Sequence, residues 1–271
     1  MNSSTLLGLS TFAYLLMSVG HLYRLLFKQP GADRILIPAA WTALVINILG
    51  WLLRWSETTQ TGHGYVPLSN MYEALTALSW CMVLVYLLME RHYKTGVLGV
   101  MVFPLVSMAM AYASLSPNVN QQIQPLIPAL QSNWLTYHVL SCFLGYAAFA
   151  VSFGAAIALL LKLRGDDNTA KTDQFDEIIY KANAIGFLML TIGIITGSVW
   201  ASRAWGDYWS WDPKETWSLV TWMVYAIFLH ARLSRNWRGK RAAILSIAGF
   251  IAVLFTFFGV NYLLSGLHSY A

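Results

Sequence analysis

The stretch AAILSIAGFIAVLFTFFGVNYLL, residues 242–264, contains no charged side chain. A helix rises about 1.5 Å per residue, so roughly 20 apolar residues cross the hydrocarbon core of a bilayer. Similar apolar runs recur along the chain, at about 5–27, 35–54, 70–89, 97–113, 135–161, 178–201 and 216–233. Such runs must be helical, because lipid offers the backbone no hydrogen bonds. The sequence therefore predicts an all-α polytopic membrane protein with about eight transmembrane helices.

The composition agrees with this class of protein. Of the 271 residues, 57% are hydrophobic and only 11% are charged, whereas soluble domains carry about 25% charged residues. The first apolar run lacks the basic flank and cleavage site of a signal peptide. No soluble domain, repeat or low-complexity tract is visible. We therefore expect a single integral membrane domain over 1–271.

The distribution of basic residues predicts the orientation. Eight crossings place both termini on one side of the membrane. Of the 17 lysines and arginines, only Arg54, Arg203 and Lys214 fall on that side, and the other fourteen lie in the opposite loops. Basic loops are typically cytoplasmic, so we expect both termini to face outward. The sequence pI of about 9.2 follows from this asymmetry and does not indicate a nucleic-acid partner.

The connecting segments differ in character. In the outward segment 55–69, turn-forming residues lead to a helix that Ser69 or Asn70 caps, with Glu73 in its first turn. The uncharged, proline-containing segment 114–134 is a candidate for a short interfacial helix. The inward segment 162–177 reads as a solvated connector.

A third outward segment is unusually aromatic. AWGDYWSWDPKETW, residues 204–217, carries five aromatic rings and four charged side chains between two apolar runs. Pro213 suits the first position of a helix, with Asp212 as its N-cap and Glu215 at the third position. For these two carboxylates a capping role is favoured over a catalytic one.

Four histidines lie within or beside predicted crossings. His138 and His268 flank the aromatic segment at the outward surface, whereas His21 and His230 lie toward the cytoplasmic side. Ionisable side chains in a membrane indicate function by default, although each histidine alone could be an interhelical hydrogen-bonding residue. Two imidazoles beside flat aromatic rings suit the two faces of a haem. Haem is therefore the leading ligand.

Two further features limit the alternatives. Cys81 and Cys142 lie within predicted helices and form no C-x-x-C pattern, so we interpret them as small buried hydrophobes. Electron-transfer bundles of the cytochrome b type usually clamp haem with histidines repeated on one helix. No predicted helix here holds two histidines, which weakens that alternative without excluding it.

The aromatic segment also carries a recognisable pattern, W-G-x-Y-W-x-W-D-x-K-E-x-W. It resembles the tryptophan-rich (WWD) haem-handling signature of cytochrome c biogenesis membrane proteins, and among them the CcsA/ResC family of the system II cytochrome c synthase. The likeness continues at PLSNMYEAL (67–75), WLTYHVLSCFLGYAAF (134–149) and GVNYLLSGLHSY (259–270). An interfacial aromatic belt would need neither the fixed glycine nor the D-x-K-E run.

The resemblance implies roles for the matched residues. His138 and His268 would ligate an outer haem iron, and His230 an inner one whose second ligand comes from a CcsB/ResB-like partner subunit. Depth alone makes His21 an in-chain candidate for that second position. The loop of about 202–217 would contact the haem through further residues, namely Arg203, Trp205, Tyr208, Trp209, Trp211, Asp212, Lys214 and Trp217. In this set the tryptophans would wall the porphyrin or the peptide channel, and Arg203 and Lys214 would pair with the haem propionates or with nearby carboxylates.

The family also implies an activity. The chain would present, and translocate, haem b for covalent attachment to the C-x-x-C-H cysteines of an apocytochrome c, as a haem lyase that needs its partner subunit. A thioredoxin-like protein would keep the thiols reduced. The membrane would be a bacterial inner membrane or a thylakoid, with the active loop on the periplasmic or lumenal side. The alternatives are a haem transporter without a role in attachment and a b-type electron-transfer subunit.

Overall fold

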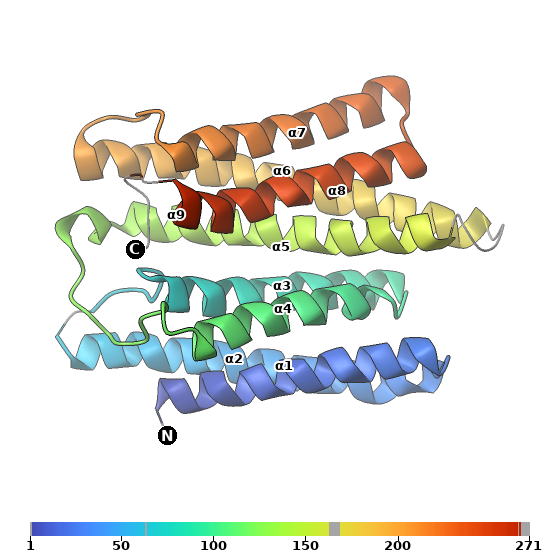
Figure 1. The fold of residues 1–271 in the computed structure, drawn as a ribbon, viewed down its shortest axis with the longest axis horizontal. Helices are drawn as coiled ribbons and strands as arrows, with labels where there is room; N and C mark the ends of the chain where they lie inside the picture. The colour runs from blue at the N-terminus through green and yellow to red at the C-terminus, as the bar shows by residue number, and fades with distance from the viewer. Residues whose placement is uncertain (1, 63, 163–168, 265, 267–271) are drawn as a thin grey trace. The chain divides into compact units, whose positions relative to one another are not determined.

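The computed structural model of this chain describes residues 2–62, 64–162, 169–264 and 266. In these residues every regular element is helical, and there is no strand. The chain divides into two compact units, Met1–Gln131 (unit 1) and Ser132–Ala271 (unit 2). Each unit is a bundle of helices that run back and forth along a common direction (Figure 1).

Unit 1 contains four long helices joined by short connections. They are α1 (Ser3–Leu26), α2 (Asp33–Gln60, after the 3-10 turn η1, Pro30–Ala32), α3 (Met71–Tyr93) and α4 (Leu98–Leu115). Helix α1 packs against α2 and α4, and α3 packs against the same two helices. Short connections make successive helices antiparallel neighbours.

Unit 2 is built around a long helical hairpin. Its helices are α5 (Asn133–Lys162), α6 (Thr169–Trp205), α7 (Pro213–Arg235), α8 (Lys240–Leu254) and α9 (Val260–Leu263), with a π-helical segment η3 (Phe255–Gly259) between the last two. Helices α5 and α6 form the most extensive pair, and α8 packs on both α5 and α7.

The membrane character predicted from the sequence is confirmed. Among the described residues, seven helices are long and apolar enough to cross a bilayer: α1 to α6, and α8 together with its continuation to Leu263. The eighth predicted crossing, 216–233, is the helix α7, which has sufficient length at 23 residues. Its histidine, threonines and tryptophans make it less apolar than the others. The outward orientation of the termini, and the single domain over 1–271, stay predictions.

Two connecting segments differ from expectation. The predicted solvated connector 162–177 is helical from Thr169 onward, because the buried Phe175 continues the apolar face of α6 and Asp176 is held by Arg232 at 2.6 Å. In the segment 114–134, the only helical turn after α4 and before α5 is η2 (Pro128–Leu130). Three prolines there interrupt the backbone hydrogen bonding that a longer helix needs.

The predicted cap of α3 is confirmed, and it belongs to a larger polar cluster. The side chain of Asn70 accepts a hydrogen bond of 2.9 Å from the amide of Glu73. The Glu73 carboxylate in turn accepts from Ser69 and from Arg54 Nε at 2.9 Å. Both partners of this ion pair are almost fully buried, at 2% exposure for Arg54 and 0% for Glu73. The pair ties the end of α2 to the start of α3.

Candidate functional site

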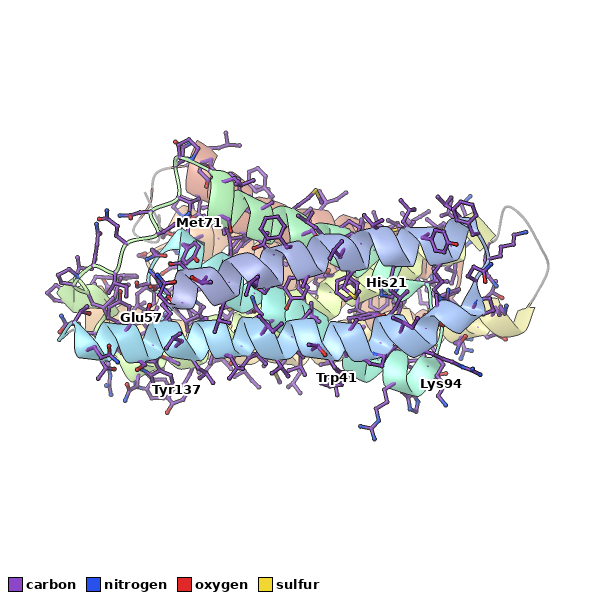
Figure 2. All side chains as sticks on the ribbon, turned by 90° about the horizontal axis from the view of Figure 1, so that it is seen from below. His21, Trp41, Glu57, Met71, Lys94 and Tyr137 are labelled. Carbon is purple, nitrogen blue, oxygen red and sulfur yellow. The ribbon has the colours of Figure 1, made fainter. Side chains whose placement is uncertain are left out.

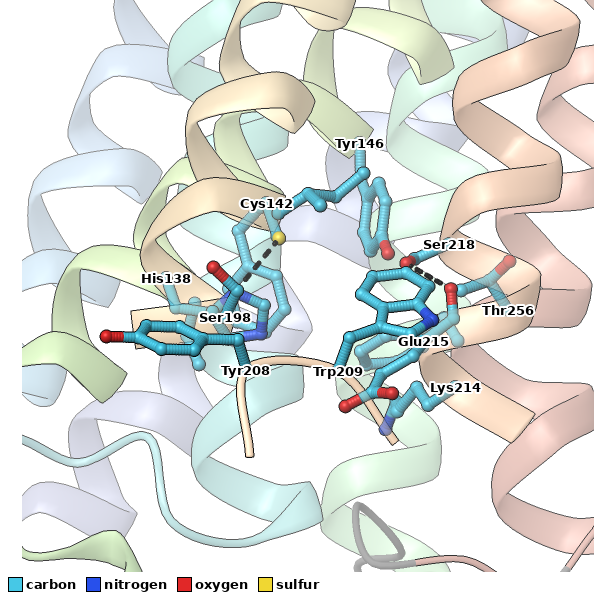
Figure 3. A pocket seen from close by; sticks show the side chains of 15 residues that line it. His138, Cys142, Tyr146, Ser198, Tyr208, Trp209, Lys214, Glu215, Ser218 and Thr256 are labelled. Atoms are coloured by element: carbon cyan, nitrogen blue, oxygen red, sulfur yellow. Dashed lines mark hydrogen bonds between the residues drawn. The ribbon is translucent and has the colours of Figure 1, made fainter. Parts of the chain in front are cut away.

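The aromatic segment 204–217 closes a small cavity at one end of unit 2. The first turns of α5, the end of α6, the loop that leads into α7, and η3 all contribute side chains to it (Figure 3). The cavity has a volume of about 80 Å³. The residues that line it are His138, Val139, Cys142, Phe143, Tyr146, Ile194, Gly197, Ser198, Tyr208, Trp209, Lys214, Glu215, Ser218, Thr256 and Phe257.

His138 is held in one orientation by α6. Its Nδ1 lies 2.7 Å from the carbonyl oxygen of Gly193, which can only accept, so Nδ1 carries the proton. Its ring stacks on Trp200, with 6.0 Å between centroids and 15° between planes. Nε2 is consequently the nitrogen with the lone pair. This is the usual state of an iron-binding imidazole, whose other nitrogen donates to a carbonyl group.

Glycines on α6 make room for this arrangement. A Cβ at Gly197 would lie 2.5 Å from Nδ1 of His138, and one at Gly193 would lie 2.5 Å from Sγ of Cys142. The residues 138 and 142 are one turn apart on α5, and the two glycines are one turn apart on α6. Small residues at matched positions let two membrane helices approach closely. The imidazole therefore occupies space that any larger residue at 197 would remove.

The loop between α6 and α7 is bent and strongly tied. Gly206 and Trp211 both have positive φ angles, 94° and 59°. For a residue as large as tryptophan this conformation is strained by about 1–3 kcal/mol. The carboxylate of Glu215 holds the loop by accepting from the amide of Ser210 at 2.8 Å, and the side chain of Asp212 accepts from the amide of Lys214 at 2.9 Å.

The predicted start of α7 is confirmed. Asp212 is the N-cap, Pro213 occupies the first turn, and Glu215 completes a capping box. Both carboxylates are nearly buried, at 7% and 8% exposure. Glu215 accepts from the amide of Ser210 and Asp212 from the amide of Lys214, and these contacts support the structural role expected for the two carboxylates.

Lys214 brings a positive charge to the cavity. Its Nζ donates a hydrogen bond of 2.8 Å to Oδ1 of Asn261 on α9. It lies in the first turn of α7, ahead of the segment expected to cross the membrane. Burial lowers the pKa of Lys214 to about 8, against opposing effects of the Asp212 carboxylate and the Cys142 thiol. Lys214 is therefore mostly protonated at neutral pH.

The tryptophans of the signature occupy different positions. Trp209 lines the cavity. Trp211 packs edge-on against Trp209, with 5.7 Å between the ring centroids, and 67% of its surface is exposed. Trp205 contacts Trp200 edge-on at 4.9 Å, so it lies behind the ring that stacks on His138. Trp217 packs on Phe255 of η3 at 4.2 Å and does not line the cavity.

Two other predicted residues lie at the margin of this site. Tyr208 lines the cavity but is 64% exposed. Arg203 is exposed, and its guanidinium lies 5.8 Å from the ring of Trp134 at the start of α5. His268 lies outside the described residues. The last described residue before it, Gly266, packs against Asp212 and Pro213.

The two histidines expected toward the cytoplasmic side, His21 and His230, belong to different units. His230 is exposed on α7, with its Nδ1 3.5 Å from Oγ of Ser234. His21 is fully buried in unit 1, where its ring stacks on Phe103 at 5.0 Å and Tyr86 lies 3.5 Å from Nε2. Its Nδ1 has no hydrogen-bond partner among the described residues.

Sequence reasoning missed several residues of the site. Cys142 was read only as a buried hydrophobe, and it is buried, yet it also lines the cavity and lies 3.8 Å from Nδ1 of His138. Its spacing of four residues from His138 was the available signal. Trp200 lies five residues before Trp205, outside the quoted pattern. Tyr146, four residues beyond Cys142, continues the same spacing on α5. Thr256 had no comparable signal, because only helix packing brings it to the cavity.

Comparison with known proteins gives a consistent result. The profile of the cytochrome C assembly protein family matches residues 68–268. The chain is 36% identical over 299 residues to "Cytochrome c biogenesis protein CcsA" of Prochlorococcus marinus (strain MIT 9303), covering 97% of this chain and 92% of that protein. It is 41% identical over 252 residues to the protein of the same name in Chlamydomonas reinhardtii, covering 90% and 69%.

A solved structure shares the fold. "Cytochrome c Heme Lyase CcmF" superposes with a TM-score of 0.74 at 18% sequence identity. The superposition covers 95% of this chain and 47% of that chain. This chain therefore spans about half the length of that protein.

Proposed function

Because this chain belongs to the CcsA family of cytochrome c assembly proteins and functions in cytochrome c biogenesis, we propose that unit 2 presents haem b for covalent attachment to an apocytochrome c. The observation that carries the proposal is the hydrogen bond from His138 Nδ1 to the Gly193 carbonyl. It favours the tautomer whose Nε2 would ligate iron, and it increases the basicity of that nitrogen.

The cavity beside His138 has to open to admit the substrate. At about 80 Å³ it is well below the 300–1,000 Å³ of typical ligand pockets. The loop residues 206–211 would move, since the backbone turns at Gly206 and at the strained Trp211, and this motion would break the hydrogen bonds from Ser210 to Glu215. The capping box at Asp212 would stay in place and act as the fixed end of this motion.

The opened site offers partners to both parts of a haem. Trp209 and Tyr208 supply flat apolar surface for the porphyrin, and Trp200 backs the imidazole. Lys214 would pair with a propionate in exchange for its bond to Asn261. Arg203, farther out on Trp134, is the second candidate for a propionate partner.

The second iron ligand on this face would be His268. Gly266 packs against Asp212 and Pro213, and only one residue separates it from His268 in the sequence. An extended chain reaches about 3.3–3.6 Å per residue. Asp212 and Pro213 adjoin the cavity-lining Lys214, so this short tether supports a ligand pair formed by His138 and His268.

The reaction adds two cysteine thiols to the two haem vinyl groups. In each addition the sulfur bonds to one vinyl carbon and the thiol hydrogen ends on the other, so no external oxidant is consumed. The protein contributes positioning, which is worth up to about 7–11 kcal/mol in well-aligned systems. The apocytochrome thiols must be reduced, and a thioredoxin-like protein would keep them in that state.

A second haem position would lie at the other end of unit 2. His230 is exposed on α7, so its ring is accessible to a neighbouring subunit. We assign the second ligand there to a CcsB/ResB-like partner, because His21 is enclosed by aromatic rings in unit 1. Haem would pass from this cytoplasmic position to the periplasmic or lumenal site at His138. The whole chain would act as one haem-handling domain and as a haem lyase only with its partner.

The test uses the protein with its CcsB-type partner and a reporter apocytochrome c, in a host without its own maturation system. The variant His138→Ala is compared with His92→Ala, which removes an exposed histidine at the end of α3. Optical spectra report bound haem, and haem staining of the denatured reporter reports covalent attachment. Only His138→Ala is expected to lose covalent attachment together with the part of the haem spectrum that comes from the His138 site, and added imidazole should restore that low-spin component.

Other outcomes separate the alternatives. Full haem binding and full reporter maturation in His138→Ala would refute the proposal. Haem binding lost with maturation intact would assign attachment to another protein and leave this chain as a transporter. A haem that cycles reversibly with a quinone, in a protein whose loss leaves maturation unchanged, would indicate an electron-transfer subunit.

A further inference from the structure

Unit 1 contains a second, larger cavity, which is independent of the proposed function. It lies between the start of α2 and the end of α3 and has a volume of about 540 Å³. Figure 2 shows His21, Trp41 and Lys94 toward the same end of the unit. This end also carries Arg24, Lys28 and Arg34, so the cavity opens in the most basic region of unit 1.

The acidic residues of the cavity are already neutralised or hydrogen-bonded. Asp33 forms an ion pair with Arg24, whose Nη2 lies 2.6 Å from Oδ2. Glu90 accepts hydrogen bonds from the hydroxyl of Thr95 at 2.8 Å and from the amide of Gly96. These contacts fix the connections before α2 and after α3.

The basic residues of the cavity are not neutralised in this way. Arg91 and Lys94 both line it and are exposed. Neither forms an ion pair with any residue that the structure describes. Two exposed positive charges that form no such ion pair attract an anionic group at a membrane surface.

The remaining wall is apolar and continues beyond the cavity. Ile37, Trp41 and Leu87 line the cavity itself. On α2 the line continues at i+3 and i+4 spacing through exposed residues on the same side of the helix, namely Val45, Leu49 and Leu52. From residue 37 to 52 this stripe extends about 22 Å at 1.5 Å per residue. It begins at the charged rim and runs along the membrane-crossing part of α2.

We propose that this cavity binds the headgroup of an anionic phospholipid. The phosphate would contact Arg91 and Lys94, and an acyl chain would follow the stripe from Ile37 to Leu52. A haem shares the combination of anionic and apolar parts, but the residues that line the cavity include no histidine, cysteine or methionine for its iron. Basic pockets between transmembrane helices commonly hold such lipids.

The experiment compares lipid binding by three forms of the full-length protein in native mass spectrometry. They are the wild type, the double variant Arg91→Gln with Lys94→Gln, and the control Lys28→Gln with Arg34→Gln. The control removes the same charge from exposed positions at the same end, outside the cavity. The probes are phosphatidylglycerol and phosphatidylcholine with identical acyl chains. Helical circular dichroism and the unfolding temperature verify that each variant folds.

Each basic side chain near the phosphate should contribute about a fivefold preference. The wild type is therefore expected to prefer phosphatidylglycerol by about thirtyfold, and the double variant by about twofold or less. The control should keep at least about a tenfold preference. If the double variant does not fold, the two single variants replace it, each with an expected loss of about fivefold.

Three results would overturn the proposal. The first is an equal loss of preference in the double variant and the control, which would indicate general surface charge. The second is competition by free glycerol 3-phosphate as strong as that of the whole lipid, which would indicate a soluble anion. The third is displacement of the lipid by haem that depends on Arg91 and Lys94, which would make the cavity a haem site.

Discussion

The backbone of Gly197 lies directly against the imidazole of His138, so that a Cβ at position 197 would fall 2.5 Å from Nδ1. Real Cβ contacts are not this short, and the ring would have to move. The ring is also held by its bond to Gly193 and by Trp200. Movement would therefore break the arrangement that presents Nε2.

We first predict that Gly197→Ala loses haem without losing its fold. Alanine favours the helical state over glycine by about 0.5–1 kcal/mol, so the unfolding temperature should not fall by much. The optical spectrum of the purified variant with its partner should show less low-spin haem than that of the wild type. Gly8→Ala is the control, because nothing lies within 4 Å of a Cβ at that position of α1. Normal haem content in Gly197→Ala would show that haem binding does not depend on the present position of the His138 ring.

The second prediction concerns pH. Because burial lowers the pKa of Lys214 to about 8, its ammonium group loses the proton as the pH rises through that value. An interaction with a propionate is then weakened above pH 8 and is present below it. Haem retention in the wild type should decrease between about pH 7 and 9.

Two variants test this assignment. Lys214→Arg should hold haem across the same range, because a guanidinium stays protonated. Lys214→Met should bind haem more weakly and show no step near pH 8. A step of unchanged size in Lys214→Met would assign the titration to another group. The measurement is a spectrophotometric haem titration at each pH.

The third prediction concerns the cap of α7. Asp212→Ala removes the side chain that accepts from the amide of Lys214 and forms half of the capping box. Loss of such a cap costs about 0.5–2 kcal/mol, so the unfolding temperature should decrease. The loop 206–212 should also become more accessible to limited proteolysis. Asp207→Ala removes an exposed carboxylate from the same loop without a capping role and should change neither. Equal effects of the two substitutions would contradict the role of the cap.

The fourth prediction concerns the buried ion pair of unit 1. Glu73→Gln leaves the guanidinium of Arg54 without its charge partner at 2% exposure, and such a change costs about 3–5 kcal/mol. The double variant Arg54→Met with Glu73→Gln should recover a large part of that loss, because no unpaired charge remains. The exposed pair of Glu177 and Lys181 is the control, where Glu177→Gln should cost about 0.5 kcal/mol or less.

Thermal unfolding in detergent measures all three changes. If the double variant is as unstable as Glu73→Gln alone, the loss does not arise from the unpaired charge. It would then arise from the hydrogen bonds that Glu73 accepts from Ser69.

Local sequence determined the membrane helices, the caps and the family pattern. Apolar runs such as 242–264 specify helices because lipid leaves the backbone no other way to satisfy its hydrogen bonds. The caps at Asn70 and Asp212 were predictable because a cap involves residues only three positions apart. The family pattern of the segment 204–217 was recognisable for the same reason, since the whole pattern is contiguous.

Tertiary structure decided which side chains meet. His138 and Gly193 are 55 residues apart, and their contact depends on how α5 packs against α6. The same packing brings Cys142 to the cavity and leaves Trp217 outside it. The helical part of 162–177 and the cavity of unit 1 also depend on contacts between helices, such as the pairing of Asp176 with Arg232. Periodicity along one helix contains no information about the face of another, and for that reason these features emerged only from the folded chain.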